Sequence, residues 1–272
     1  MNISNGTWEF IRDIYGKRLV MVQLARQDLH NRYVGSALGL VWTFIQPLVM
    51  TLILWAVFTL AFKTHTVHGV PFVLWLLVGL TVWNCFSESL TITTGVFYEY
   101  SFLVKKIRFN IAVLPLVKIF SSLAVHGIFL LIVMGILTVN RITPSIYWLQ
   151  LLYYLLALVT LLLGLSWITS SLNVLVKDVA YIVNVLLQFG FWLTPVFWDT
   201  SLIPAPYQKY LIVLKLNPLA YIVEGYRQSL LYHTPFWSDI GWTVYFWLVA
   251  VGMLVLGAVI FRKLKPHFAD VL

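Results

Sequence analysis

Long stretches without charge constrain this chain more than any other feature. No Asp, Glu, Lys or Arg occurs from Tyr33 to Phe62, and a second such stretch runs from Ile142 to Val176. About 20 predominantly apolar residues are enough for a helix to cross the hydrocarbon core of a bilayer. Since both stretches are longer than that, they predict a chain whose solvent is lipid rather than water.

The composition supports a membrane protein. The 272 residues are 61% hydrophobic and 10% charged, with a mean hydropathy of +0.89, whereas soluble domains contain about 25% charged residues. A formal net charge of +8 could indicate nucleic acid as a partner. The basic residues, however, cluster beside the apolar stretches, where Lys and Arg set topology and contact anionic lipid headgroups. We therefore expect membrane lipids and no nucleic acid.

The stretches between charges predict an all-α integral membrane protein with six transmembrane helices. Turn-forming residues such as Gly69, Pro71 and Pro144 separate the predicted spans. Twelve Lys and Arg residues lie on one predicted side and five on the other, so the positive-inside rule places both termini in the cytoplasm. The predicted spans are 40–62, 71–95, 112–138, 146–170, 179–197 and 241–261.

The segment 7–22 has the pattern of an amphipathic helix. Trp8, Ile11, Tyr15, Leu19 and Val22 recur at steps of three and four residues, which is one stripe of a helix. Such a helix lies in the interface plane of a membrane, and residues 23–36 would connect it to the first span. The alternative is a short soluble helix packed on another subunit.

The segment 198–240 fits neither a turn nor a span, because it is too long for the one and too polar for the other. We expect two short re-entrant helices that dip into the outer leaflet, divided at Asn217-Pro218. A surface cap without a mechanism is the alternative. The whole chain, 1–272, is then a single transmembrane domain: a cytoplasmic or interfacial segment (1–39), a six-span bundle (40–261) and a cytoplasmic tail (262–272).

Several sequence motifs of catalysis are absent. The chain contains no P-loop, no H-E-x-x-H, no G-x-S-x-G and a single cysteine, so we expect no catalytic residue, metal site or cofactor in this chain. Ionisable residues inside a membrane are functional candidates by default. Those within the predicted spans are Glu88, Lys118 and His126, and none has an evident partner. Glu88 stays open, whereas Lys118 is expected to extend to the interface.

Four segments, in this order, resemble the ABC-2 family of transporter permeases. They are RQDLHNRYVGSALGLVWTFIQPL (26–48), YEYSFLVKKIRFN (98–110), NVLVKDVAYIVNVLLQFGFWLTPVFW (173–198) and LNPLAYIVEGYR (216–227). The similarity is greatest to the subgroup that exports O-antigen, capsule or teichoic acid polysaccharides. Gln27 separates Arg26 from Asp28 where the two are usually adjacent, so the partner of Asp28 stays open.

The resemblance implies a homodimer in the bacterial cytoplasmic (inner) membrane that works with two copies of a cytoplasmic ATP-binding ABC subunit. That subunit would use ATP and Mg²⁺, which agrees with the missing P-loop. The implied cargo is a polysaccharide linked to undecaprenyl diphosphate. The alternatives are an ABC-2 permease that exports a drug or lipid, a stand-alone membrane flippase or glycosyltransferase, and an ion-coupled transporter.

This resemblance and the residue types predict four groups of functional residues. Aromatic side chains in 98–108 would dock into the ATPase within a polar rim, those in the spans would stack on sugars, and the outer segment would form a gate. The coupling residues are Tyr98, Glu99, Tyr100, Phe102, Lys105, Lys106 and Arg108. The interface-helix residues are Trp8, Ile11, Arg12, Tyr15, Arg26, Asp28 and Arg32. The channel-lining candidates are Trp42, Phe44, Trp83, Phe86, Tyr181, Phe189, Phe191 and Trp192. The gate candidates are Trp198, Pro204, Pro206, Tyr207, Asn217, Pro218 and Tyr221.

Overall fold

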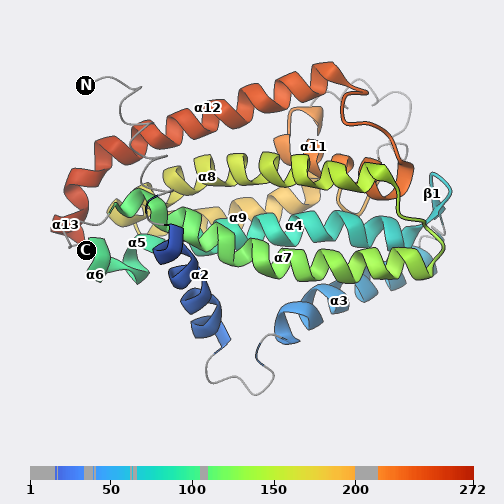
Figure 1. The fold of residues 1–272 in the computed structure, drawn as a ribbon, viewed down its shortest axis with the longest axis horizontal. Coiled ribbons are helices and arrows are strands. Elements are labelled where there is room, and N and C mark those ends of the chain that lie inside the picture. Colours follow the sequence, from blue (N-terminus) through green and yellow to red (C-terminus); the bar gives the residue numbers. More distant parts are fainter. Residues whose placement is uncertain are drawn as a thin grey trace.

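The protein is a bundle of long helices that run side by side along one axis (Figure 1). The computed structural model describes residues 16, 18–33, 39, 41–61, 63, 66–104, 110–199 and 214–272. Within these ranges the strands are one short antiparallel pair, β1 (Thr66–Val67) and β2 (Val70–Pro71). This hairpin lies at one end of the bundle, and the last helix, α13 (Phe268–Val271), lies at the other. The expected all-α class is confirmed.

Five helical segments are long and apolar enough to cross a membrane, and they coincide with the first to fourth and the sixth predicted spans. They are Phe44–Ala61, Phe72–Thr94, Ile111–Val139, Ile146–Leu175 and Ile240–His267. The helix at the fifth predicted span, α9 (Asp178–Leu193), has 16 residues. At 1.5 Å per residue it is about 24 Å long, less than the hydrocarbon thickness of about 30 Å. A sixth span therefore stays a prediction.

Short helical turns and capping side chains define several helix ends. Asn110 accepts a hydrogen bond from the Ala112 amide at the start of the 3₁₀ turn before α7, and Asp239 caps α12 by accepting from the Trp242 amide at 3.0 Å. That amide lowers the pKa of Asp239. The long helices and their extensions are α3 (Val41–Ala56) with a π-helical turn Val57–Ala61, α4 (Phe72–Thr94), Ile111–Val113 with α7 (Leu114–Val139), Ile146–Gln150 with α8 (Leu151–Leu175), and α12 (Ile240–Leu264) with Lys265–His267.

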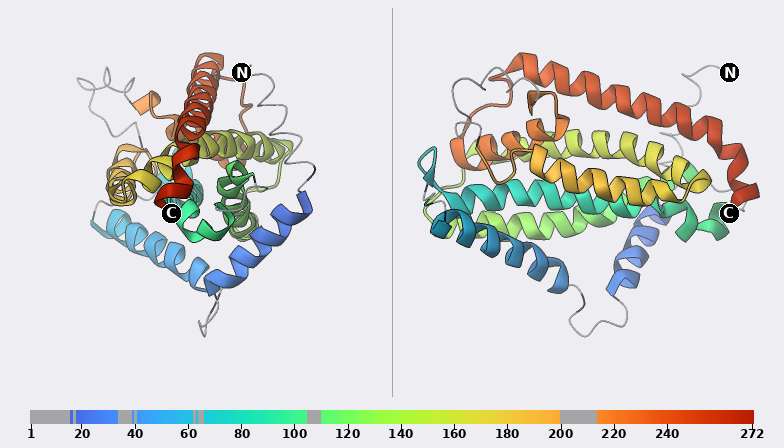
Figure 2. Two further views of the ribbon diagram at one scale, coloured as in Figure 1. Left: turned by 90° about the vertical axis from the view of Figure 1, so that its left-hand side faces the viewer. Right: turned by 180° about the vertical axis from the view of Figure 1, so that it is seen from behind.

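Helix α4 is the centre of the bundle. In its most apolar stretch 72% of the residues are buried inside the protein. The corresponding share is 11% for the span that contains α3 and 22% for the span that contains α12. It contacts α3, α7, α8 and α9. Figure 2 shows α3 and α9 on one side of the bundle and α2 and α7 on another. Helix α3 exposes most of its large apolar side chains and α12 exposes several, so both helices lie at the outside of the bundle.

Helices α8 and α12 approach each other closely through two glycines. A Cβ atom added at Gly164 would lie 2.6 Å from the backbone nitrogen of Leu254, and Gly257 faces Gly164 from the other helix. Real Cβ atoms do not approach backbone atoms so closely. Small residues at such crossings let two backbones meet, which is a common way of packing helices in membranes.

The expected amphipathic helix 7–22 lies mostly outside the described residues, and the first helix that the structure describes follows it. Residues 1–15, with Trp8, Ile11, Arg12 and Tyr15, lie outside the described residues. Helix α2 (Arg18–Tyr33) covers most of the stretch that was expected to be a connection, and it packs on α7. Leu19 and Val22, two members of the predicted stripe, are exposed.

The expected coupling segment contains two single-turn helices, α5 (Val96–Glu99) and α6 (Ser101–Val104), at the same end of the bundle as α13 (Figure 1). Residues 105–109, with Lys105, Lys106 and Arg108, lie outside the described residues. Helix α5 ends at Tyr100, which leaves the helical conformation with φ −102° and ψ 30°.

The outer segment contains a buried helix, α11 (Pro218–Arg227), followed by a π-helical turn, Gln228–Tyr232. Asn217 caps it by accepting from the Leu219 amide at 3.0 Å, and Pro218 occupies its first turn. Most of α11 is buried against α4, α8 and α12, which a surface cap would not be. Its re-entrant placement in a leaflet stays a prediction, and 200–213, with Pro204, Pro206 and Tyr207, lie outside the described residues.

Candidate functional site

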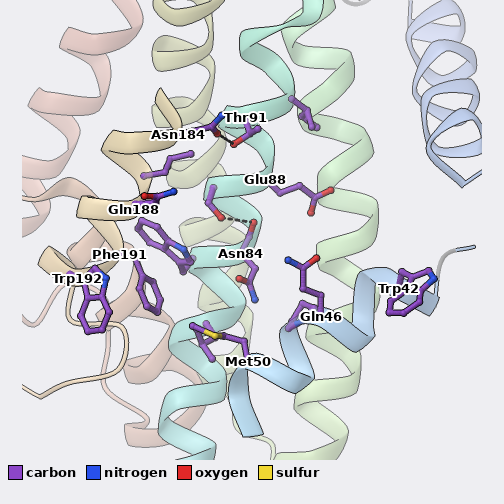
Figure 3. A pocket seen from close by; sticks show the side chains of 16 residues that line it. Trp42, Gln46, Met50, Asn84, Glu88, Thr91, Asn184, Gln188, Phe191 and Trp192 are labelled. Carbon is purple, nitrogen blue, oxygen red and sulfur yellow. Dashed lines mark hydrogen bonds between the residues drawn. The ribbon is translucent and has the colours of Figure 1, made fainter. Parts of the chain in front are cut away.

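A groove of about 1060 Å³ runs between α3, α4 and α9. Figure 3 shows α4 in the middle, with Gln46 and Trp42 of α3 on one side and Gln188, Phe191 and Trp192 of α9 on the other. Each helix contributes residues at steps of three and four, so one stripe of each helix faces the groove. The lining residues are Trp42, Gln46, Pro47, Met50, Leu80, Trp83, Asn84, Ser87, Glu88, Thr91, Ile92, Asn184, Leu187, Gln188, Phe191 and Trp192.

A polar stripe forms the floor of the groove. Asn84, Ser87, Glu88 and Thr91 are spaced so that all lie on one face of α4. Thr91 Oγ1 donates a hydrogen bond to Asn184 Oδ1 at 3.5 Å, which joins the floor to α9. The buried Nδ2 group of Asn84 has no acceptor among the described residues. Polar groups in a spanning helix are costly unless satisfied, so this floor favours a ligand rich in hydroxyl or amide groups.

Aromatic side chains form the sides of the groove. The ring centroids of Trp83 and Phe191 are 5.3 Å apart, and those of Phe191 and Trp192 are 5.9 Å apart. Trp42 on the opposite side is 53% exposed and Trp192 is 64% exposed, so their faces are open to a ligand. The groove thus combines flat aromatic faces with hydrogen-bonding groups.

The structure brings four of the eight channel-lining candidates together in this groove: Trp42, Trp83, Phe191 and Trp192. The other four lie elsewhere. Phe86 lines a smaller cavity of about 230 Å³ between α4, α8 and α9, and Phe44 stacks on Phe129 with a centroid distance of 6.3 Å. Tyr181 and Phe189 are exposed on α9 and do not line the groove.

Sequence reasoning missed the polar part of the groove because it considered aromatic residues alone. A signal was present: amide and hydroxyl side chains recur at helical spacing inside spans that are otherwise apolar, and such residues mark functional faces. The residues concerned are Gln46, Asn84, Ser87, Thr91, Asn184 and Gln188.

A cluster of five charged side chains, here called the charge cluster, joins the groove to the coupling segment. Arg32 on α2 donates to Asp28 Oδ2 at 2.6 Å and to Glu88 Oε1 at 3.0 Å. Lys118 on α7 donates to Asp28 Oδ1 and, at 2.6 Å, to Glu99 on α5. The cluster therefore runs from α5 through α7 and α2 to the floor of the groove, and it supplies the partners of Asp28 that the sequence left open.

This cluster corrects the prediction for Lys118 and gives Glu88, which the sequence left open, a partner. Lys118 was expected to extend to the interface, but its side chain is 4% exposed and paired with Asp28 and Glu99. Glu88 has a partner in Arg32, which lies 56 positions away in the chain. Burial raises the pKa of Asp28, but the hydrogen bonds and charges of Lys118 and Arg32 outweigh that effect, so the pKa lies below its usual value.

His126, the third residue without an evident partner, also has one. Its Nε2 atom lies 3.0 Å from the hydroxyl of Tyr226 on α11. This buried contact ties the outer segment to α7, and the sequence did not indicate it, because 100 positions separate the two residues.

The coupling residues differ in how they are placed. Tyr98 donates to the Val174 carbonyl at 3.1 Å, and Tyr100 is 8% exposed. Burial raises the pKa of Tyr100 to about 12, helped by the carboxylates of Asp28 and Glu99, so its hydroxyl stays protonated. Phe102 is 57% exposed, and it is the aromatic side chain of α5 and α6 best placed to enter a pocket of another protein.

The outer segment holds the end of α9, where Trp192 lines the groove. Asn217 donates to Thr194 Oγ1 at 2.8 Å. Arg227 is one of the five basic residues expected on the outer side of the membrane. It is buried, and it donates to the carbonyls of Pro195 and Val196 at 2.8 and 2.7 Å. Its guanidinium lies 3.4 Å from the centre of the Trp75 ring.

Two further gate candidates pack nearby. Trp198 donates its indole N–H to the Trp192 carbonyl at 3.0 Å. Tyr221 stacks on Phe246 of α12 with a centroid distance of 4.7 Å. The segment that was expected to act as a gate is therefore in direct contact with one side of the groove.

A bundle of long apolar helices with a polar and aromatic groove along one side defines a polytopic α-helical membrane protein. Residues 20–231 match the sequence profile of the ABC-2 type transporter family. The chain belongs to this family, and it is a multi-pass protein of the bacterial inner membrane.

Relatives align with the chain over almost its entire length. An O-antigen export system permease protein RfbA from Klebsiella pneumoniae is 28% identical over 258 residues, which cover 93% of this chain and 95% of the relative. A protein of the same name from Myxococcus xanthus is 29% identical over 264 residues, which cover 96% and 98%. A second Klebsiella pneumoniae protein of this name is 26% identical over 258 residues, which cover 93% and 95%.

Proposed function

We propose that this chain is the permease subunit of an ABC transporter that exports a lipid-linked polysaccharide of the O-antigen type across the cytoplasmic membrane. Two copies of the chain and two copies of a separate ATP-binding subunit would form the transporter. The observation that carries the proposal is the groove between α3, α4 and α9, because its chemistry suits sugars. The relatives named as O-antigen export permeases support the same cargo.

The two kinds of side chain in the groove suit a moving polymer. Aromatic faces such as those of Trp42 and Trp192, which are 53% and 64% exposed, can pack against the C–H surfaces of sugar rings. The amides of Gln46, Asn84 and Gln188 can exchange hydrogen bonds with sugar hydroxyls, which replaces the water that the sugar loses. Many weak contacts of this kind hold a chain in place and still let it advance.

A homodimer accounts for the open side of the groove. The span that contains α3 exposes large apolar residues, and the groove is not enclosed within one protomer. A second copy related by a two-fold axis would place an identical groove opposite the first, and the two together would enclose a path shielded from lipid.

The charge cluster provides a route for force from the ATPase. Exposed Phe102 would dock into the ATP-binding subunit, and Glu99, three positions before it, is paired with Lys118. A displacement of α5 would therefore act on Lys118, then on Asp28 and Arg32, and finally on Glu88 in the groove floor. The outer segment would form the gate at the opposite end, where it contacts the end of α9.

The test is export by purified components. The tagged chain is purified from its source bacterium with its ATP-binding partner, which mass spectrometry identifies, and the complex is reconstituted in liposomes with polyprenyl-diphosphate-linked glycan. We expect the glycan to become accessible to a glycosidase on the far side only with ATP. A complex whose ATPase carries an inactive catalytic site is the control.

Two results would contradict the proposal. Export by the chain without any nucleotide-hydrolysing protein would exclude the ABC mechanism and favour a stand-alone flippase. ATP-dependent movement of a drug or an unglycosylated lipid, with no movement of the glycan, would favour the other class of ABC-2 permease.

A further inference from the structure

The groove carries a charge pattern that bears on the kind of polysaccharide it accepts, an inference that rests on the proposed function. Among the described residues that line it, Glu88 is the one with an ionisable side chain, and none is Lys, Arg or His. The other polar lining residues are neutral amides and hydroxyls. Since a second copy in a symmetric dimer would repeat the same side chains, it would add a second carboxylate and no cation.

The cations nearest to the groove in the described part of the chain are already neutralised. Arg32 pairs with Asp28 and Glu88, and Lys118 pairs with Asp28 and Glu99. The charge cluster therefore contains three carboxylates and two cations, a formal charge of −1. The side chain of Glu88 is 38% exposed and that of Arg32 is 17% exposed, so a ligand in the groove meets the carboxylate first.

An acidic glycan would find no compensation in this groove. Its carboxylates or phosphodiesters would have to leave water for a path between apolar helices, where an unpaired charge is strongly unfavourable. The ion pair of Glu88 with Arg32 would not attract them, because its formal charge is zero and its more exposed member is the carboxylate. Binding sites for carboxylate and phosphate groups normally present Arg or Lys.

An uncharged glycan meets none of these costs. Its hydroxyls can pair with the polar side chains of the groove floor, such as Ser87 and Thr91. Its ring faces can pack on the exposed rings of Trp42 and Trp192. We infer that the groove is selective for an uncharged polysaccharide and rejects chains with an anionic group in each repeat.

The experiment uses the full complex in liposomes with two substrates on the same polyprenyl diphosphate. The glycans have equal length: one consists of neutral hexoses, and the other has a hexuronic acid in each repeat. Because the lipid and diphosphate are identical, a difference in the rate of ATP-dependent export reports on the sugars. We expect the neutral glycan to be exported at least tenfold faster.

A charge added to the groove should change this selectivity. Gln188→Lys places a cation on the α9 side of the groove, and we expect it to reduce the preference for the neutral glycan at least threefold. Asn140→Lys is the matched control, because it adds the same charge at the exposed C-terminal end of α7, outside the groove. Size-exclusion chromatography and ATP hydrolysis verify that both variants form the complex.

The outcomes separate this inference from the proposed function. Equal export of the two glycans, or faster export of the acidic one, would overturn the inference and leave the proposed function standing. An unchanged preference in an assembled Gln188→Lys complex would also overturn it, since the selecting site would then lie elsewhere. Export of neither glycan would contradict the proposed function itself, and the inference with it.

Discussion

Replacing Lys118 with Met tests whether the charge cluster stabilises the fold. The substitution keeps a long apolar side chain and removes the ammonium group that pairs with Asp28 and Glu99. The loss of this ion pair costs little free energy at Glu99, because its side chain is 53% exposed and can be hydrated. Asp28 is 2% exposed and would keep Arg32 as its partner. The cost of the substitution is therefore concentrated on Asp28.

The expected loss of stability is about 3 kcal/mol. Removing one partner of a buried ion pair costs about 3–5 kcal/mol, and the remaining pair with Arg32 argues for the low end. That energy corresponds to a change of about a hundredfold in the unfolding equilibrium. Lys215→Met is the matched control: its pair with Asp239 has side chains that are 56% and 47% exposed, so the loss should not exceed about 1 kcal/mol.

Unfolding of the purified protein by stepwise addition of SDS, followed by circular dichroism, measures both variants. A double-mutant cycle with Asp28→Asn then isolates the interaction, and the double variant should be clearly more stable than the sum of the single losses predicts. Two results would show that the charge cluster does not stabilise the fold. One is a loss of stability for Lys118→Met no larger than that of the control, and the other is strict additivity in the double-mutant cycle.

The same pair predicts a dependence on pH. Because the pKa of Asp28 is lowered in the folded protein, its ionised form stabilises the fold above its unfolded pKa, and this contribution disappears as the pH falls through the folded value. The stability difference between the wild type and Asp28→Asn should be constant near neutral pH and shrink below about pH 4, close to the usual Asp pKa. A difference that shrinks already near pH 6 would contradict the lowered pKa.

Three more substitutions test other parts of the structure. Phe102→Ala should uncouple ATP hydrolysis from export without changing the SDS midpoint, because its side chain is exposed; normal coupling would exclude it as a docking residue. Gly164→Ala should lower the free energy of unfolding by about 1–3 kcal/mol, because the added methyl group forces α8 and α12 apart. Gly127→Ala is the control: its Cβ position has open space around it, so the SDS midpoint should not change. Arg227→Gln should cost about 2–5 kcal/mol, because buried carbonyls after α9 lose a charged donor; an unchanged midpoint would show that the outer segment does not hold α9.

Local patterns in the sequence predicted the spans closely. The charge-free stretch that begins at Ile142 became the span Ile146–Leu175, and the last predicted span, 241–261, became α12. These patterns are reliable because a helix in lipid satisfies its own backbone hydrogen bonds, so apolar length alone decides where it forms. The fifth predicted span is less certain for the same reason, since α9 has 16 residues.

The candidate site was predictable only in part. Trp42 and Trp83 were proposed from residue type and line the groove, whereas Tyr181 and Phe189 were proposed on the same grounds and lie outside it. Residue type does not indicate which face of a helix a neighbour covers. On α4 the stripe that begins at Asn84 was visible as a spacing in the sequence, but its meaning depends on α3 and α9 lying beside it.

The amino-acid sequence was enough to predict that this chain spans a membrane and where most of its helices lie, because both follow from the local order of apolar and charged residues. The resemblance to a family of permeases came from four short segments. The contacts of Arg32 with Glu88 and of Lys118 with Asp28, and the groove between three helices, could be seen only in the folded chain. Such contacts depend on how helices far apart in the chain cross one another, because the free energy of a side chain in lipid depends on the partner that packing brings to it.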